Sequence, residues 1–302
     1  MKKILVPTDF SKLSEYALEL AIELAQKFDA KITLVTSLHY DFNIEIREAA
    51  LVTSTLLKKV EESVSHSMQQ LVNKYSDSGV LINHYISDKS LVAQLNNKIH
   101  DENYDLVVMG TKGSSGIDEF FIGSNTEKVV RKASCPVISV SGKTTLAEIK
   151  KLMIPVDLED IRESFLLKIA ELQKTFDLML DFVWVKTPHN IQNEVEISKE
   201  ISLTLKDKGI TNFSFHIVRA VIPAEGILTY VNEAKIDMIA MATHARKGLA
   251  HWLTGSVTED TVNHAKIPVW SFKLDSKEKS INLESAKNLY ERSFYSAIEM
   301  PI

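Results

Sequence analysis

Short apolar runs alternate along this chain with longer amphipathic stretches. Residues 4–6 form a compact apolar run that ends at Pro7, a pattern typical of a buried strand. From Ser11 onward, apolar residues recur every three or four positions as far as Phe28, which is the one-sided spacing of an amphipathic helix. Strands that alternate with helices in this way predict parallel βαβ units with right-handed crossovers.

The same alternation continues to residue 140. The pattern predicts further strands at 32–35, 79–86, 106–109 and 136–140, and further helices over 43–75, over 90–103 and from Ser124 onward. The segment 43–75 is polar and contains neither glycine nor proline, and its length suits one kinked helix or two helices.

The second half of the chain repeats motifs of the first half. Three pairs of segments match in order: LMIPVD at 152–157 with ILVPTD at 4–9, DMIAM at 237–241 with DLVVM at 105–109, and KIPV at 266–269 with SCPV at 134–137. The first pair is offset by 148 positions and the other two by 132, so the first half carries about 16 additional residues, most of them between its second and third strands. The repeat predicts two tandem α/β domains, at 1–142 and 150–273, followed by a tail at 274–302.

A glycine-rich segment follows the strand predicted at 106–109. Ser124 and Glu127 then show the S-x-x-E spacing of a capping box, which predicts a helix that begins at Ser124. Glycines let the backbone approach an anion closely, and a helix N-terminus supplies unpaired N–H groups. A strand, a glycine loop and a helix start in this order are typical of phosphate binding, although glycine clusters also occur as ordinary turns. The glycines of this segment are Gly110, Gly113, Gly116 and Gly123.

The glycine spacing resembles the G-2x-G-9x-G-(S/T) pattern of the ATP-binding branch of the universal stress protein family. Two residues separate Gly110 from Gly113, and nine residues then precede Gly123. Residues 1–11 (MKKILVPTDFS) resemble the first strand of the family and its acidic turn, and Cys-Pro-Val at 135–137 resembles the start of its last strand. The three motifs fall in the expected order.

The resemblance implies that each domain is a doubly wound, five-stranded, mostly parallel sheet of order 3-2-1-4-5 with helices on both faces. In such a sheet, strands one and four flank the point where the strand order reverses, and ligands bind there. Asp9 and Gly110 are therefore expected to converge on one crevice, with Asp9 at the nucleotide ribose instead of serving only as a helix-capping aspartate. The implied cofactor is ATP, with or without Mg²⁺. The implied binding residues are Pro7, Thr8, Asp9, Ser37, Met109, Gly110, Lys112, Gly113, Gly123, Ser124, Asn125 and Thr126.

The second copy departs from this pattern at its leading glycines. Ala242 and Ala245 stand at the positions of Gly110 and Gly113, whereas Ser256 and the rest of the spacing are kept. A Cβ atom at these positions is expected to crowd phosphate oxygens, so we expect a structural copy that no longer binds ATP well. The alternative is that basic residues still attract an anion there: Arg246, Lys247 and His251.

Composition narrows the class of protein. The 302 residues are 45% hydrophobic and 25% charged, as in an ordinary globule, and the net charge of −5 disfavours nucleic acid as a partner. The N-terminus lacks the pattern of a signal peptide, and no apolar run approaches the roughly 18 residues of a membrane span. The single cysteine, Cys135, is expected to be an inert core thiol, with a redox sensor as the alternative. We therefore expect a cytoplasmic protein without a membrane partner.

Other chemical motifs carry little weight. Gly142-Lys143-Thr144 resembles the end of a Walker A motif, but the glycine required five positions before it is Val137. The histidines lack a recognised short ligand spacing, so no metal site is expected. Asp9 and Asp118 are carboxylates near the glycine loop, but neither has a visible catalytic partner, so we assign no catalytic residue.

Three functions remain open at this point. The first is an ATP-binding regulatory protein of the stress response, which the resemblance favours; the second is a slow ATP hydrolase; the third is a structural module without a ligand. In the family, paired domains meet through their last strands, so we expect residues 136–140 and 268–272 to pair antiparallel within the chain. The tail has apolar residues at near-helical spacing, which predicts a helix that packs on its own chain or in a homodimer.

Overall fold

The computed structural model describes residues 1–38, 50–111, 124–243, 257, 261, 264–275, 277–281 and 283, with the backbone alone at 50–57 and 124. The chain divides into two compact units, Met1–Leu146 and Ala147–Ile302, which we treat separately. Among the described residues, no helix combines the length and apolar character needed to cross a bilayer.

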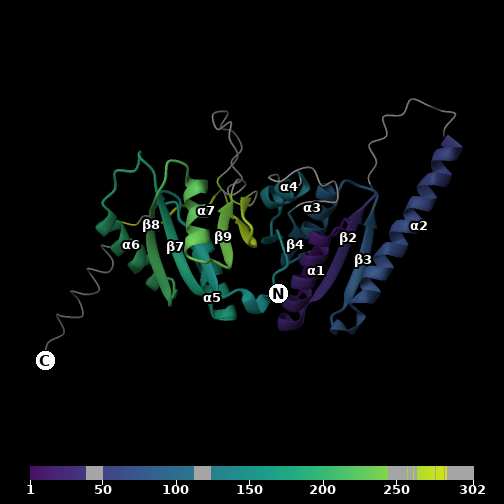
Figure 1. Cartoon of the computed structure of the whole chain (residues 1–302), viewed down its shortest axis with the longest axis horizontal. Helices are drawn as coiled ribbons and strands as arrows, with labels where there is room; N and C mark the ends of the chain where they lie inside the picture. Colours follow the sequence, from purple (N-terminus) through teal and green to yellow (C-terminus); the bar gives the residue numbers. More distant parts are fainter. Residues whose placement is uncertain are drawn as a thin grey trace. The chain divides into compact units, whose positions relative to one another are not determined.

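The first unit alternates strands with helices throughout (Figure 1). Its elements are β1 (Lys3–Pro7), α1 (Lys12–Phe28), β2 (Lys31–Ser37), α2 (Ala50–Lys74), a 3-10 turn (Ser76–Ser78), β3 (Ile82–Ser87), α3 (Leu91–Glu102), β4 (Leu106–Gly110), α4 (Ser124–Lys132) and β5 (Val137–Val140). The strand order is β3-β2-β1-β4-β5, and the neighbouring strands run parallel. The predicted order 3-2-1-4-5 is confirmed.

The second unit repeats this arrangement. Its elements are β6 (Lys151–Pro155), α5 (Glu163–Phe176), β7 (Met179–Lys186), α6 (Glu194–Asp207), β8 (Phe213–Arg219), α7 (Pro223–Glu233), β9 (Met238–Thr243) and β10 (Val269–Lys273), and a further 3-10 turn (Leu146–Glu148) precedes them. The order is β8-β7-β6-β9-β10, again with parallel neighbours. The pairing expected between 136–140 and 268–272 is a relation between the units, and it stays a prediction.

The central strands are the most deeply buried part of the first unit, as their apolar runs predict. Ile4, Leu5 and Val6 of β1 have no exposed surface. Residues of α3 and α4 pack with Leu5 and Val107 in one cluster on one face of the sheet, and α1 runs along β1, β2 and β4 (Figure 1). The carboxyl ends of β1 and β4 therefore lie side by side on a rigid platform.

Two elements differ from the sequence expectation. The third strand was predicted from residue 79, but Gly79 has a positive φ of 72° and ends the 3-10 turn, so β3 begins only at Ile82. The helix predicted over 43–75 is a single element from Ala50 to Lys74, and residues 43–49 lie outside the described residues. The tail helix falls almost entirely outside the described residues and stays a prediction.

Candidate functional site

The strand order of the first unit reverses between β1 and β4. These strands are adjacent and parallel, with Ile4 opposite Leu106 and Leu5 opposite Val107. Beyond β1 lie β2 and β3, and beyond β4 lies β5, so consecutive connections leave this point in opposite directions. The carboxyl ends of such a pair are the usual place for a ligand crevice in an open α/β sheet.

A polar turn joins β1 to α1 at this edge. The N–H of Thr8 continues the pairing with β2 by donating to Val35 O at 2.8 Å, and the Thr8 hydroxyl lies 3.0 Å from that of Ser14. Oδ1 of Asp9 accepts from Ser11 N–H at 3.1 Å, and the Ser11 hydroxyl caps α1 by accepting from Ser14 N–H at 3.3 Å. The structure thus places the Asp9 carboxylate at the crevice and fixes it there through the turn.

Phe10 takes an unusual backbone conformation within this turn. Its φ is 63°, in the left-handed region that bulky residues avoid, and 40% of its surface is exposed. Its N–H donates to the Thr8 hydroxyl at 3.1 Å, which fixes the turn from inside. The turn therefore stores backbone strain directly beside Asp9.

Gly110, the last residue of β4, lies directly against the start of α1. A Cβ atom placed on Gly110 would come within 3.0 Å of the carbonyl carbon of Leu13 and 3.1 Å of the backbone nitrogen of Ser14. These are backbone atoms of the first helical turn, and they cannot swing aside. A side chain here would force these backbone atoms to shift by a few tenths of an ångström, so helix packing favours glycine at 110, in addition to any role in ligand approach.

The N-terminus of α4 is fastened to the same residue. Thr126, in the first turn of α4 and 3% exposed, donates its hydroxyl to the Gly110 carbonyl at 2.9 Å. Asn125 is exposed. The helix begins at Ser124, as the capping-box spacing predicted, although the side chain of Ser124 is not described. Two helices therefore start beside Gly110.

The remaining predicted residues fall into three groups. Pro7 ends β1 and is buried, and Ser37 ends the adjacent β2, where its hydroxyl donates to Lys89 O at 2.7 Å. Met109 is 4% exposed and belongs to the core cluster under α3 and α4, so only its backbone can reach the crevice. Three residues lie outside the described residues, together with Asp118: Lys112, Gly113 and Gly123.

The second unit keeps the acidic turn but changes the helix start. Oδ1 of Asp157 accepts from Glu159 N–H at 3.0 Å, much as Asp9 accepts from Ser11. The helices α1 and α5 end 148 positions apart, at Phe28 and Phe176, but α5 begins three residues late, at Glu163. The counterparts of the residues that crowd Gly110 therefore precede the helix. The loop from 244 to 256 lies outside the described residues.

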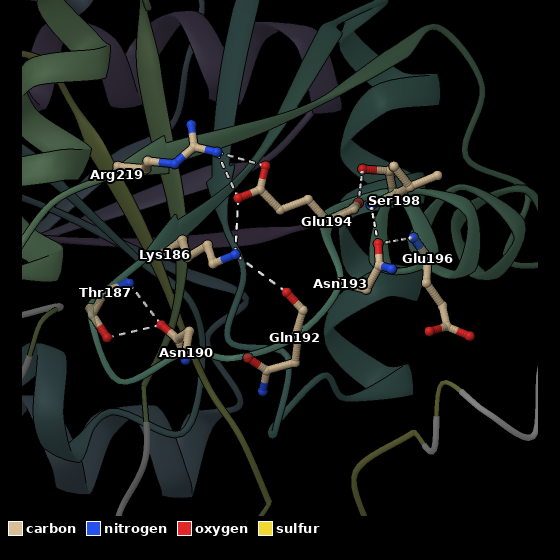
Figure 2. A network of polar contacts seen from close by, with 10 residues as sticks. Lys186, Thr187, Asn190, Gln192, Asn193, Glu194, Glu196, Ser198 and Arg219 are labelled. Atoms are coloured by element: carbon tan, nitrogen blue, oxygen red, sulfur yellow. Dashed lines mark hydrogen bonds and ion pairs between the residues drawn. The ribbon is translucent and has the colours of Figure 1, made fainter.

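A charged network at the ends of β7 and β8 was not found from the sequence (Figure 2). Arg219 donates to both carboxylate oxygens of Glu194 at 2.7 and 2.8 Å, and Lys186 Nζ donates to the same carboxylate at 2.9 Å. Lys186, with Arg219, holds the pKa of Glu194 below its ordinary value. These residues are 8 and 25 positions from Glu194, too far apart for a local pattern, and the pairing of both cations with one carboxylate indicates a structural role.

No group of three or more His, Cys, Asp or Glu residues forms a metal site in the part of the chain that the structure describes. Within that part, the crevice of the first unit offers backbone donors, hydroxyl groups and one carboxylate. Such a set can hold a polar ligand, but it supplies no evident nucleophile–base pair.

The fold and the crevice define a tandem protein of two doubly wound α/β domains. The model of the universal stress protein family matches residues 1–141 and again residues 148–273, so the chain belongs to the universal stress protein family. The resemblance recognised in the sequence is confirmed.

Individual relatives agree with this assignment. A universal stress protein of Methanocaldococcus jannaschii is 28% identical over 141 residues, which cover 46% of this chain and 81% of the relative. A protein of Staphylococcus aureus named for the same family is 30% identical over 152 residues, covering 46% of this chain and 83% of its own. The crystal structure of a universal stress protein from Archaeoglobus fulgidus covers 90% of this chain and 98% of its own, with a TM-score of 0.70 and 18% identity, and this likeness concerns the fold alone.

Proposed function

We propose that the first unit binds ATP and that the chain is a nucleotide-dependent regulatory protein of the stress response. The observation that carries this proposal is the meeting of two helix N-termini at Gly110. The first turn of α1 lies against this residue, and Thr126 of α4 donates to its carbonyl. Each helix N-terminus carries partial positive charge and unpaired N–H groups, so a phosphate chain is favoured between them.

The residues of the crevice suit the parts of a nucleotide. Backbone groups of the glycine loop, with Ser124 and Asn125, are assigned to the phosphates, with or without Mg²⁺. Asp9 is assigned to the ribose, since its carboxylate is held at the crevice by Ser11. The polypeptide at Pro7, Thr8 and Ser37 is assigned to the adenine, because these residues end the adjacent strands β1 and β2. Met109, Lys112, Gly113, Gly123 and Thr126 complete the assigned set.

Equilibrium dialysis of labelled ATP against the full-length chain tests this assignment. Gly113→Val is expected to abolish binding while circular dichroism and thermal unfolding stay unchanged. Ala245→Val is the matched control, because position 245 is the counterpart of 113 in the second copy, and it should bind as the wild type does. Wild-type affinity in Gly113→Val would show that the loop assignment is wrong.

A turnover assay under the same conditions separates binding from hydrolysis. We expect ATP to remain intact over many dissociation times, because Oδ1 of Asp9 already accepts a hydrogen bond from Ser11 N–H and is held in the turn. Sustained phosphate release that the Asp9→Asn variant lacks would identify the chain as a hydrolase instead.

A further inference from the structure

The chain that follows β10 returns to the start of α5. We call residues 274, 275, 277–281 and 283 the strap. Its first residue, Leu274, donates its N–H to Thr243 O at 3.0 Å, and Ile281 N–H donates to Ile161 O at 2.8 Å. Leu274 and Leu283 are 4% and 8% exposed. The strap is thereby fastened to the end of β9 and to the residues just before α5, the two elements that border the strand-end crevice of the second unit.

An acidic side chain of the strap caps α5. Oε1 of Glu278 accepts from Ser164 N–H at 2.8 Å, and Oε2 accepts from the Ser164 hydroxyl at 2.5 Å. The N-cap position of α5 is Arg162, whose side chain makes no capping hydrogen bond and is instead paired with Asp160. Glu278 thus supplies, from 114 residues away, the anionic group that a helix N-terminus favours.

The first helix of the first unit is capped in a different way. Its helix α1 is capped locally by Ser11. The chain after β5 turns away from that end, because Leu146 N–H donates to Oε2 of Glu23, beyond the middle of α1, at 2.6 Å. Among the described residues of the first unit, no carboxylate from the end of the domain lies at the N-terminus of its first helix. Within the part of the chain that the structure describes, a carboxylate from the C-terminal end of the domain caps the first helix in the second unit only.

We propose that the strap is an autoinhibitory contact that keeps anionic ligands out of the second unit. Glu278 occupies the N–H and the hydroxyl of Ser164, donors at the start of α5 that a nucleoside polyphosphate at the ends of β6 and β9 would otherwise meet. Its carboxylate also repels phosphate oxygens at close range. Because α5 begins only at Glu163, the residues that correspond to Leu13 and Ser14 precede the helix, and the strap lies where the first unit has a locally capped helix start. This inference is independent of ATP binding by the first unit.

The test uses the full-length chain with Gly113→Val, so that only the second unit can respond. Into this background we would introduce Glu278→Ala, with Glu171→Ala as the control, because Glu171 lies on α5, the helix that Glu278 caps, and pairs at its surface with Lys168. Labelled ATP is measured by equilibrium dialysis, and backbone hydrogen exchange is followed over 277–281. With Glu278→Ala we expect the backbone amides of the strap to exchange faster and the affinity for ATP to rise by about tenfold or more, because a charged capping interaction is lost. With Glu171→Ala we expect neither change.

Two results would overturn the proposal. If the strap exchanges faster but ATP affinity does not rise, the strap does not control access. If exchange is unchanged, Glu278 does not hold the strap. Should Glu278→Ala fail to fold, Glu278→Gln removes the charge but keeps the shape, and the same two criteria apply to it. Failure of the first-unit assignment would appear separately, as absence of ATP binding by the wild-type chain.

Discussion

Leu13 occupies the space that a side chain on Gly110 would need: a Cβ atom there would lie 3.0 Å from the Leu13 carbonyl carbon. The contact joins the end of β4 to the first turn of α1 across 97 positions of sequence. A change in how α1 packs against the end of the sheet would therefore also change the geometry of the candidate site in the first unit.

We predict that Gly110→Ala destabilises the first unit by about 1–3 kcal/mol, because overpacking must shift backbone atoms of α1. The free energy of unfolding in urea measures the effect. Gly142→Ala is the control, since a Cβ atom at Gly142 meets nothing within 4 Å and should leave stability unchanged. Equal stability of Gly110→Ala and wild type would mean that the helix start adjusts without cost.

Because the backbone of Phe10 is left-handed, we predict that a glycine variant at this position is more stable than an alanine variant, the reverse of the usual order. Phe10→Gly should be more stable than Phe10→Ala by about 1 kcal/mol, because only glycine adopts this φ without strain. At Leu158, the counterpart in the second unit, φ is not positive, so the alanine variant should be the more stable one. Thermal unfolding of the four variants would reveal the two opposite orders; the same order at both sites would argue against strain at Phe10.

The hydrogen bond from Thr126 to Gly110 O predicts a moderate cost for Thr126→Val. The valine keeps the buried shape but leaves the carbonyl of Gly110 without this donor, so about 1 kcal/mol of stability should be lost. Thr175→Val serves as control, because its hydroxyl bonds to Glu171 O on an exposed helix surface and should change stability by less than about 0.5 kcal/mol. Equal losses of stability in Thr126→Val and Thr175→Val would show that the hydrogen bond from Thr126 contributes no more than an ordinary surface hydrogen bond.

Cys135 should behave as an inert thiol in the folded protein. Burial raises the pKa of its thiol to about 12 from an ordinary 9.0, so the reactive thiolate is scarce at neutral pH. Because the folded pKa is the higher one, this thiol should favour the folded state below about pH 9 and progressively less as pH rises toward 12. At pH 8 a disulfide reagent should label the Cys135 thiol only as fast as the protein unfolds. Rapid labelling of the native chain would contradict this prediction.

Calorimetry should return one ATP per wild-type chain, since the first unit keeps the glycine pattern and the second unit has Ala242, Ala245 and the strap. Two equivalent sites would show that neither feature excludes nucleotide. The heat measured when ATP is added to the Gly113→Val chain serves as the reference for a chain whose first unit does not bind ATP.

The sequence predicted those features that depend on local periodicity. The apolar run at 4–6 lies within β1, which buries both of its faces, and the helical spacing from Ser11 to Phe28 corresponds to α1, which buries one face. The third strand was placed too early: β3 is largely exposed, and its pattern carries little hydrophobic signal.

Other features depend on contacts that no local pattern records. The approach of Leu13 to Gly110 and the capping of α5 by Glu278 join residues that are about one hundred positions apart. A glycine motif indicated phosphate binding at 110, but it did not reveal that helix packing also favours glycine there. The strap had no counterpart in the first copy, so comparing the repeats could not predict where it would lie.

The late start of α5 bears on how the two copies can diverge. In the first unit a substitution at 110 acts on the fold itself, so selection for stability alone would preserve glycine there even without a ligand. In the second unit, where alanine stands at 242, α5 begins only at Glu163, so the counterparts of Leu13 and Ser14 precede the helix. The residue that ends the fourth strand of the domain is therefore under a packing constraint from the first helix in one copy, whereas the other copy lacks that constraint in the same form.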